Sequence, residues 1–335
     1  MRILYAVGFS DWWGNYPPDV LDREDSGTVG GGETCALRTA AGLADRGHEV
    51  AFCSVARAGT WRGVTFYPWS RFVSVYLDKG PWDALVAFSD AGALRFAVNG
   101  EARVLVQQLN DLLYAGDWWR WTDVICAASS THEAYLRTLA APEVLAPSGP
   151  RWQPVSNGVD PALFPDPTPA PVSRPPWVGY WSSPDRGLTH LLDAWPRIRE
   201  RVPGARLKVF YQVKKYIEHV RYAILDGRAI HTGRLLAERL AALAGDGGVD
   251  LMDALPRRAL AREQIKCRVM CYPCNPDGFT EGFGQAVPEA MLAGALPVVR
   301  CADAFAELWQ PAVVPLVESP ASEEFVEEIM DRVVW

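Results

Sequence analysis

The chain has 335 residues, more than one ordinary hydrophobic core accommodates, so its length predicts two domains. With 49% hydrophobic and 22% charged residues, the composition is that of a globular, soluble protein. No apolar run approaches the roughly 20 residues that a membrane-spanning helix needs. The net charge of -7 argues against a nucleic-acid polyanion as the main partner, although a local basic groove can coexist with an acidic surface.

The N-terminus, MRILYAVG, is a short apolar run with one arginine and lacks the long apolar region of a signal peptide. We therefore expect a cytoplasmic protein. Seven cysteines without an export signal predict free thiols. Cys267, Cys271 and Cys274 lie in or beside a predicted strand, with no second cysteine pair or histidine nearby, so we expect buried apolar residues and no metal site.

Strand-like and helix-like segments alternate along the first half of the chain. RILYAV at 2–7 and HEVAFCSV at 48–55 have the pattern of buried strands, and residues 31–47 that of a helix ended by a glycine. Three more strand-like runs follow, namely DALVAFS at 83–89, RVLVQQ at 103–108 and DVICAAS at 123–129. Strands separated by helix-length segments predict a parallel sheet with crossover helices.

A proline-rich stretch then interrupts the pattern. Seven prolines lie between positions 161 and 176, and proline is excluded from the interior of sheets and helices. We expect an N-terminal domain at 1–165, a stiff linker at 166–176 and a C-terminal domain at 177–315. The remaining residues, 316–335, include an amphipathic helical segment that either packs back on the N-terminal domain or lies elsewhere.

The alternation resumes after the linker. Residues 187–202 carry apolar side chains at helical spacing on one face. One strand-like run, WVGYWSS at 177–183, precedes this helix. Four more come after it, namely ARLKVFYQV at 205–213, GVDLMD at 248–253, RVMCYP at 268–273 and ALPVVR at 295–300. Two successive α/β units predict two doubly wound, Rossmann-like domains, with a ligand bound between them beyond the carboxyl ends of the strands.

Two glycine turns are candidate phosphate-binding sites. Gly30, Gly31 and Gly32 stand at the start of the first helix, where backbone N–H groups and the helix dipole favour an anion. They lie too far beyond the first strand for the dinucleotide fingerprint, and a plain flexible loop is the alternative.

The second turn lies in DGFTEGFGQAVPEAMLAGALPVV, residues 277–299. Pro288 fits only the first turn of a helix, so the helix begins near 285 or 286. Phe283 and Gly284 then offer backbone N–H groups to an anion, and the carboxylates of Glu281 and Glu289 can accept hydrogen bonds from sugar hydroxyls. Alternatively, Glu289 only complements the helix dipole and Glu281 is a solvated loop residue.

Arg186 and three aromatic residues complete the candidate contacts. Arg186 opens the helix 187–202, where its guanidinium can join helix-end N–H groups on a phosphate or can simply be exposed. Trp12, Trp13 and Tyr16 follow the first strand, where aromatic rings can stack on an acceptor or belong to the core.

Four segments, in this order, resemble the family 4 glycosyltransferases, which are retaining enzymes of the GT-B fold. They are GGGETCALRTAAGLADRGHEV at 30–50, SNGVDPALF at 156–164, SSPDRGLTHLLDAWPRIRERVPGARLKVFY at 182–211 and EGFGQAVPEAMLAGALPVV at 281–299. The last segment is similar to the family's E-x7-E motif. The resemblance covers residues 1–310 and implies two Rossmann-like domains that face a central cleft.

The resemblance implies a role for each matched residue. Glu281 and Arg186 would be catalytic, Glu281 on the hydroxyls of the transferred sugar and Arg186 in place of the family's lysine on the diphosphate. Glu289 would hold the ribose. The donor-binding residues it implies are Gly31, Gly32, Arg186, Glu281, Gly282, Phe283, Gly284 and Glu289.

The sequence departs from the family pattern in two places. GYWSSP has no basic residue where many members place an arginine on the diphosphate, and VLVQQLNDL has no histidine where many members place one near the reacting sugar. Gln108, Asn110 and Asp111 of the latter stretch are candidate sugar or acceptor contacts. His132 lies at a helix start, and we interpret it as a capping-region or surface histidine.

Together these observations predict a retaining glycosyltransferase that moves a hexose-type sugar from a UDP- or GDP-sugar. The acceptor is left open among a glycan, a lipid, a small metabolite and a modified nucleic acid. Helix-end N–H groups and Arg186 can stabilise the leaving diphosphate, so we expect no required metal or other cofactor. Alternatives are a non-catalytic nucleotide-sugar-binding or interaction protein, a nucleotide-sugar epimerase, and a glycoside hydrolase that uses Glu281 and Glu289.

Overall fold

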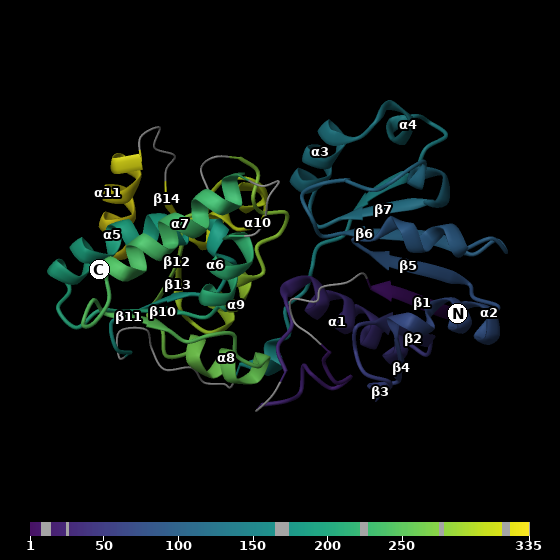
Figure 1. The fold of residues 1–335 in the computed structure, drawn as a ribbon, viewed down its shortest axis with the longest axis horizontal. Coiled ribbons are helices and arrows are strands. Elements are labelled where there is room, and N and C mark those ends of the chain that lie inside the picture. The colour runs from purple at the N-terminus through teal and green to yellow at the C-terminus, as the bar shows by residue number, and fades with distance from the viewer. Residues whose placement is uncertain are drawn as a thin grey trace. The chain divides into compact units, whose positions relative to one another are not determined.

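The computed structural model describes residues 1–7, 15–24, 27–164, 174–221, 227–274, 278–316 and 322–334. The chain divides into two compact units, Met1–Gly158 and Val159–Trp335. In Figure 1 the first unit runs from purple to teal and the second from teal-green to yellow. Most of the predicted linker, 166–176, lies outside the described residues.

The N-terminal unit is built on an eight-stranded sheet with the order β3-β4-β2-β1-β5-β6-β7-β8. All neighbours are parallel except β3 and β4. The strands are β1 (Arg2–Val7), β2 (Glu49–Ser54), β3 (Gly59–Trp61), β4 (Val64–Pro68), β5 (Ala84–Phe88), β6 (Ala102–Gln107), β7 (Val124–Ala127) and β8 (Arg151–Pro154). The α-helices are α1 (Gly31–Asp45), α2 (Phe72–Lys79), α3 (Ser130–Leu139) and α4 (Pro142–Leu145).

The core of this unit lies on both faces of the sheet, because the central strands β1 and β5 are apolar at every position after Arg2. In β1, Leu4 and Ala6 belong to one buried cluster and Ile3, Tyr5 and Val7 to another. Successive side chains of a strand point to opposite faces, so one continuous apolar run supplies two layers. The apolar runs and the helix at 31–47 that the sequence predicts therefore correspond to strands and to α1.

The C-terminal unit has an all-parallel sheet of six strands with the order β11-β10-β9-β12-β13-β14. The strands are β9 (Trp177–Tyr180), β10 (Arg206–Val209), β11 (Val249–Leu251), β12 (Val269–Tyr272), β13 (Leu296–Arg300) and β14 (Val314–Leu316). The α-helices are α5 (Leu188–Arg201), α6 (Val213–Arg221), α7 (Gly227–Ala242), α8 (Arg257–Gln264), α9 (Ala286–Leu292), α10 (Ala304–Leu308) and α11 (Ser322–Val333). From β9 the strand order runs outward in both directions, which creates a switch point between β9 and β12.

The apolar face predicted for the helix at 187–202 is the buried face of α5. Its leucines at 188, 191 and 192, together with Trp195 and Ile198, are at most 2% exposed. The C-terminal helix α11 packs on α5 in the same unit, where Arg197 pairs with Glu327 and Arg201 pairs with Asp331. The sequence did not predict whether this helix packs on the N-terminal domain or elsewhere. In the structure it packs on the C-terminal unit.

All seven cysteines are free thiols, as predicted, and Cys267, Cys271 and Cys274 are buried. Among the described residues, no group of three or more histidine, cysteine or acidic side chains is arranged to hold a metal ion. None of the helices in the described ranges combines the length and apolarity that crossing a bilayer takes.

An ion-paired carboxylate on β11 makes the stability of the C-terminal unit depend on pH. Asp250 accepts hydrogen bonds from Arg206 and lies 2.6 Å from the ammonium nitrogen of Lys208. The Arg206 hydrogen bond is the largest cause that lowers the pKa of Asp250 from 3.8 to about 2. The stabilisation is therefore complete above about pH 4 and is lost as the pH falls through the folded-state pKa.

Asp250→Asn should lower the free energy of unfolding at pH 7 by about 1 kcal/mol, discounted because Arg206 is partly exposed. At pH 2 the difference should be much smaller, because the carboxyl of the folded wild type is then about half protonated. Urea unfolding between pH 2 and pH 7 measures this. Asp117→Asn is the control, since Asp117 and Arg120 are both more than 60% exposed. A constant difference between Asp250→Asn and wild type at every pH would contradict the assignment.

Candidate active site

The predicted catalytic residues meet at the carboxyl ends of β9 and β12. Tyr180 ends β9, and the chain then turns through Pro184–Arg186 into α5. Tyr272 ends β12, and its ring lies 6.0 Å from that of Tyr180. Because β9 and β12 flank the switch point of the sheet, this is where an open α/β sheet binds its ligand.

Glu281 is held between a cation and a hydroxyl. The Tyr272 hydroxyl donates a hydrogen bond to Oε1 of Glu281, and Nη1 of Arg186 lies 3.6 Å from the same oxygen. The side chain of Glu281 is 14% exposed and that of Arg186 is 27% exposed. The structure therefore brings together the two residues that the sequence singles out as catalytic, and adds Tyr272, which no sequence motif indicates.

Burial dominates the electrostatics of this group. It raises the pKa of Glu281 above its usual value, and the charge of Arg186 and the hydrogen bond from Tyr272 limit the rise. For Arg186, burial acts to lower the pKa, but the carboxylates of Glu281 and Asp185 outweigh it and raise the pKa further. Burial also raises the pKa of Tyr272, so its hydroxyl remains a donor. Arg186 is a permanent cation at this site.

Two glycines allow the turns around Glu281 to pack tightly. Gly187 has a φ of +97°, and a Cβ there would overlap the carbonyl of Cys274, just beyond β12. Gly284 has a φ of +76°, and a Cβ there would overlap the ring of Phe305. Glycine is thus required at both positions by backbone conformation and by space.

The loop of Gly282, Phe283 and Gly284 is buried and leads into α9, which begins at Ala286, as predicted. The carbonyl of Phe283 accepts a hydrogen bond of 2.8 Å from the indole of Trp309, and the two rings form an edge-to-face pair. The predicted role of the Phe283 and Gly284 N–H groups toward an anion stays a prediction.

Glu289 lies deeper than the sequence indicated. It is 2% exposed, and its carboxylate accepts hydrogen bonds from Arg257 and, at 3.1 Å, from Gln264. Both partners come from α8. The sequence did carry one signal for this pair: an arginine in the first turn of a helix opposes the helix dipole, which favours a compensating carboxylate nearby.

The glycine run of the N-terminal unit opens α1. Gly30 is the N-cap, and a Cβ on Gly32 would meet nothing within 4 Å, so the backbone here is accessible to a ligand. Glu33 occupies part of this helix end, because its carboxylate accepts hydrogen bonds from the N–H groups of Glu33 and Gly30. Burial raises the pKa of Glu33 despite these hydrogen bonds.

Gln108 belongs to a polar cluster at the carboxyl end of the N-terminal sheet. Its amide exchanges hydrogen bonds of 2.9 and 3.2 Å with the amide of Asn157, and its backbone N–H donates to Ser89. The side-chain oxygen of Asn157 also accepts a hydrogen bond of 3.0 Å from the thiol of Cys35 in α1. The cluster places Gln108 beside the first helix.

Asn110 and Asp111 lie on the loop that follows β6, partly buried. The side-chain amide of Gln107 holds this loop by donating hydrogen bonds to the carbonyls of Leu109 at 3.1 Å and Asp111 at 2.6 Å. His132 donates to the same Leu109 carbonyl at 3.2 Å.

The interpretation of His132 as a surface histidine is wrong. The residue is 0% exposed, Nδ1 accepts the N–H of Ala128, and burial lowers its pKa. Its backbone N–H is capped by Ser129, so the capping-region part of the interpretation is correct.

Of the three aromatic candidates, Trp12 and Trp13 lie outside the described residues. Tyr16 is 2% exposed in the core of the N-terminal unit and donates to Ser54, in line with the core alternative.

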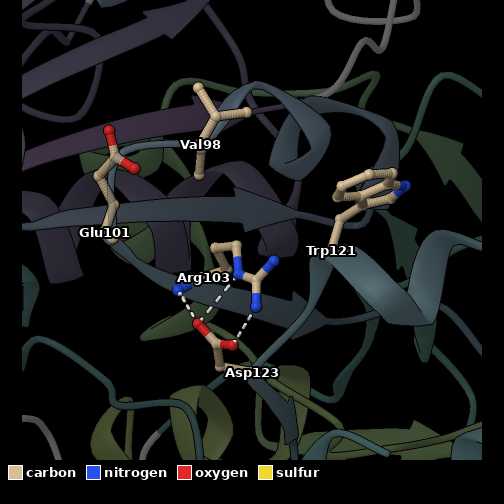
Figure 2. Close-up of a pocket in the computed structure, with 7 residues that line it drawn as sticks. Val98, Glu101, Arg103, Trp121 and Asp123 are labelled. Carbon is tan, nitrogen blue, oxygen red and sulfur yellow. Dashed lines mark hydrogen bonds and ion pairs between the residues drawn. The ribbon is translucent and has the colours of Figure 1, made fainter.

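A surface hollow of about 480 Å³ lies elsewhere on the N-terminal unit, at the amino ends of β6 and β7 (Figure 2). Its charged groups satisfy one another: Arg103 pairs with Asp123 at 2.5 Å, and Glu101 accepts from Tyr76 and Asn99. The hollow lies at the opposite end of β6 from the candidate residues Gln108, Asn110 and Asp111.

No protein-family model matches the chain, and a search of curated proteins finds no relative. Solved structures do match it in fold. Sucrose-phosphate synthase of Thermosynechococcus elongatus has 14% identity and a TM-score of 0.65, covering 99% of this chain and 93% of the synthase. HepE of Anabaena, solved with UDP and glucose, has 17% identity and a TM-score of 0.63, with 99% and 89% coverage.

A third similar structure is WaaG, a glycosyltransferase of lipopolysaccharide biosynthesis, with 13% identity, a TM-score of 0.63, and 100% and 91% coverage. The chain thus has the mixed α/β fold with two parallel sheets of the GT-B glycosyltransferases, as the sequence predicted. At these identities the likeness establishes the fold.

Gly284→Ala should destabilise the protein by about 3 kcal/mol, combining left-handed strain with overlap on Phe305. Gly204→Ala is the matched control, because Gly204 has a φ of +90° but nothing within 4 Å of a Cβ. It should cost only about 1 kcal/mol. Urea unfolding measures both, and equal losses would show that the Phe305 contact does not restrict position 284.

Arg257→Ala should lower the free energy of unfolding by about 3–5 kcal/mol, because it leaves the buried carboxylate of Glu289 without its cation. Arg257→Met combined with Glu289→Leu should recover most of this loss. Arg234→Ala, which removes an exposed ion pair with Glu238 in the same unit, is the control and should cost less than about 1 kcal/mol. Equal losses for Arg257→Ala and Arg234→Ala in urea unfolding would argue against the buried pair.

Proposed function

We propose that the chain is a retaining glycosyltransferase that transfers a hexose-type sugar from a nucleoside-diphosphate sugar. The observation that carries the proposal is the group of Glu281, Arg186 and Tyr272 at the switch point of the C-terminal sheet. It combines a carboxylate, which accepts hydrogen bonds from sugar hydroxyls, with a guanidinium suited to a diphosphate. The fold, shared with glycosyltransferases, supports the same class of enzyme.

In this proposal Arg186 binds the donor diphosphate and stabilises the charge that develops on it. The bond between the anomeric carbon and the diphosphate oxygen breaks, and the acceptor oxygen bonds to that carbon on the same face. The acceptor proton passes to the leaving phosphate oxygen, so no protein nucleophile takes part. Arg186 supplies fixed positive charge, and we propose that transfer needs no metal ion.

Glu281 accepts hydrogen bonds from hydroxyls of the transferred sugar, while Tyr272 keeps its carboxylate oriented. The backbone N–H groups of the loop at 282–284 and of Gly31 and Gly32 supply further donor contacts. Glu289 contacts the ribose through lone pairs that Arg257 and Gln264 leave available, since a carboxylate can accept about four hydrogen bonds. We place the acceptor near Gln108, Asn110 and Asp111.

UDP is the first nucleotide to test, because the similar HepE structure contains UDP and glucose. The hydrolase alternative has less support, because it needs two carboxyl groups that act as acid and nucleophile, and the Glu289 carboxylate is held in an ion pair with Arg257. A non-catalytic nucleotide-sugar-binding protein of the same fold is the second candidate, favoured by the absence of a histidine in the stretch VLVQQLNDL.

Thermal unfolding with UDP, GDP, ADP and CMP tests the donor site. A nucleotide at about 100 times its Kd stabilises the folded state by roughly 2.7 kcal/mol, which raises Tm by several degrees. Arg186→Gln should abolish the shift, whereas Arg234→Gln should preserve it. Glu289→Ala is unsuitable here, because it also leaves Arg257 unpaired in the protein interior.

The absence of a shift with every nucleotide would count against a donor site. Turnover of UDP-glucose is then measured with a panel of acceptors in the presence of EDTA. A shift in Tm without turnover would favour the non-catalytic alternative or a metal requirement. Adding Mg²⁺ or Mn²⁺ separates these two, because only a metal-dependent enzyme regains turnover.

A further inference from the structure

Asp303 has a backbone conformation that favours glycine. It lies in the turn between β13 and α10, with φ of +54° and ψ of −135°. Residues with a Cβ adopt such a conformation at a cost, and they keep it where surrounding interactions compensate. The side chain of Asp303 must therefore make contacts that a glycine could not.

Those contacts all go to the segment that carries Glu281. Oδ2 of Asp303 accepts hydrogen bonds from the N–H of Thr280 at 2.7 Å, the hydroxyl of Thr280 at 3.1 Å and the N–H of Glu281 at 3.2 Å. One carboxylate oxygen thus fixes two successive peptide groups directly before the Glu281 side chain.

The neighbouring residues hold the other side of the same segment. The N–H of Ala304 donates to the carbonyl of Glu281 at 3.2 Å, so both backbone polar groups of Glu281 are bound by Asp303 and its successor. Further along, Phe305 lies against Gly284 and Trp309 donates to the carbonyl of Phe283. The turn at 303 and the helix α10 therefore form a support for the whole loop from Thr280 to Gly284.

We propose that Asp303 is a positioning residue that sets the carboxylate of Glu281 for binding the transferred sugar. The inference rests on the proposed function, because it assigns Asp303 to the same site. Asp303 acts through the backbone of Thr280 and Glu281, and Arg186 and Tyr272 orient the far end of the Glu281 side chain. Loss of Asp303 therefore affects recognition of the sugar more than recognition of the nucleotide.

The test compares the affinities for UDP and UDP-glucose by isothermal titration calorimetry. In wild type, the sugar contribution is the ratio of the Kd for UDP to the Kd for UDP-glucose. Asp303→Ala should lower this ratio by about tenfold while changing the Kd for UDP by less than about threefold, as expected for a displaced sugar-binding group. Asp303→Asn should retain most of the ratio, since its amide oxygen can accept the same hydrogen bonds.

Two further variants separate positioning from folding. Asp303→Gly removes the strain together with the hydrogen bonds, so it should lower the ratio like alanine while costing less stability. In a Glu281→Gln background, Asp303→Ala should have no additional effect on the ratio, because residues that act through one group are not additive. Asp123→Ala is the matched control, since Asp123 also accepts a backbone N–H, at 2.8 Å from Arg103, in the other unit.

The outcomes are distinct. An unchanged ratio in Asp303→Ala, or equal losses for UDP and UDP-glucose, overturns the inference and leaves the donor site in place. A wild type that binds UDP and UDP-glucose equally also overturns it. A wild type that binds neither UDP, GDP, ADP nor their glucose conjugates overturns the proposed function, and the inference with it.

Discussion

The candidate site depends on holding a carboxylate in a place with little access to water. Glu281 is 14% exposed, and a buried charge is costly unless it is paired and hydrogen-bonded. Arg186 and Tyr272 supply this compensation from the ends of two neighbouring parallel strands. They reach Glu281 only because Gly187 lets the turn after β9 lie against the backbone that follows β12. The close packing of the two turns is therefore needed for Arg186 and Tyr272 to stabilise the buried carboxylate of Glu281.

The fold was predictable because its signals are local. Apolar runs of strand length, the helical spacing of Leu188 to Ile198 and the glycine at 47 each depend on a few neighbouring residues. In the site, the positions of Glu281 and Arg186 were likewise predictable, because each lies in a short motif. The strand order, which brings those two motifs together, is a property of the whole sheet and was available only by analogy with the family.

The partners of these residues were not predictable, because each pair joins distant parts of the chain. Asp303 lies 22 residues from Glu281, and Arg257 lies 32 residues from Glu289. The periodicity of apolar residues does not predict which carboxylate forms an ion pair with a given arginine. The interpretation of His132 as a surface residue was wrong for the same reason. Its position at a helix start can be predicted from the sequence, but its burial and its hydrogen bond to Leu109 depend on tertiary structure.

Two of the missed residues nevertheless break a local rule. Arg257 puts a positive charge at the positive end of α8, and Asp303 adopts a conformation that glycine prefers. Each is unfavourable alone and is compensated by a carboxylate or a peptide group of the segment 280–289. Natural sequences depart from local rules mainly where function or strain demands it, and both of these departures involve the segment in which we propose the donor site. The first departure can be read from a sequence, whereas the second requires the backbone.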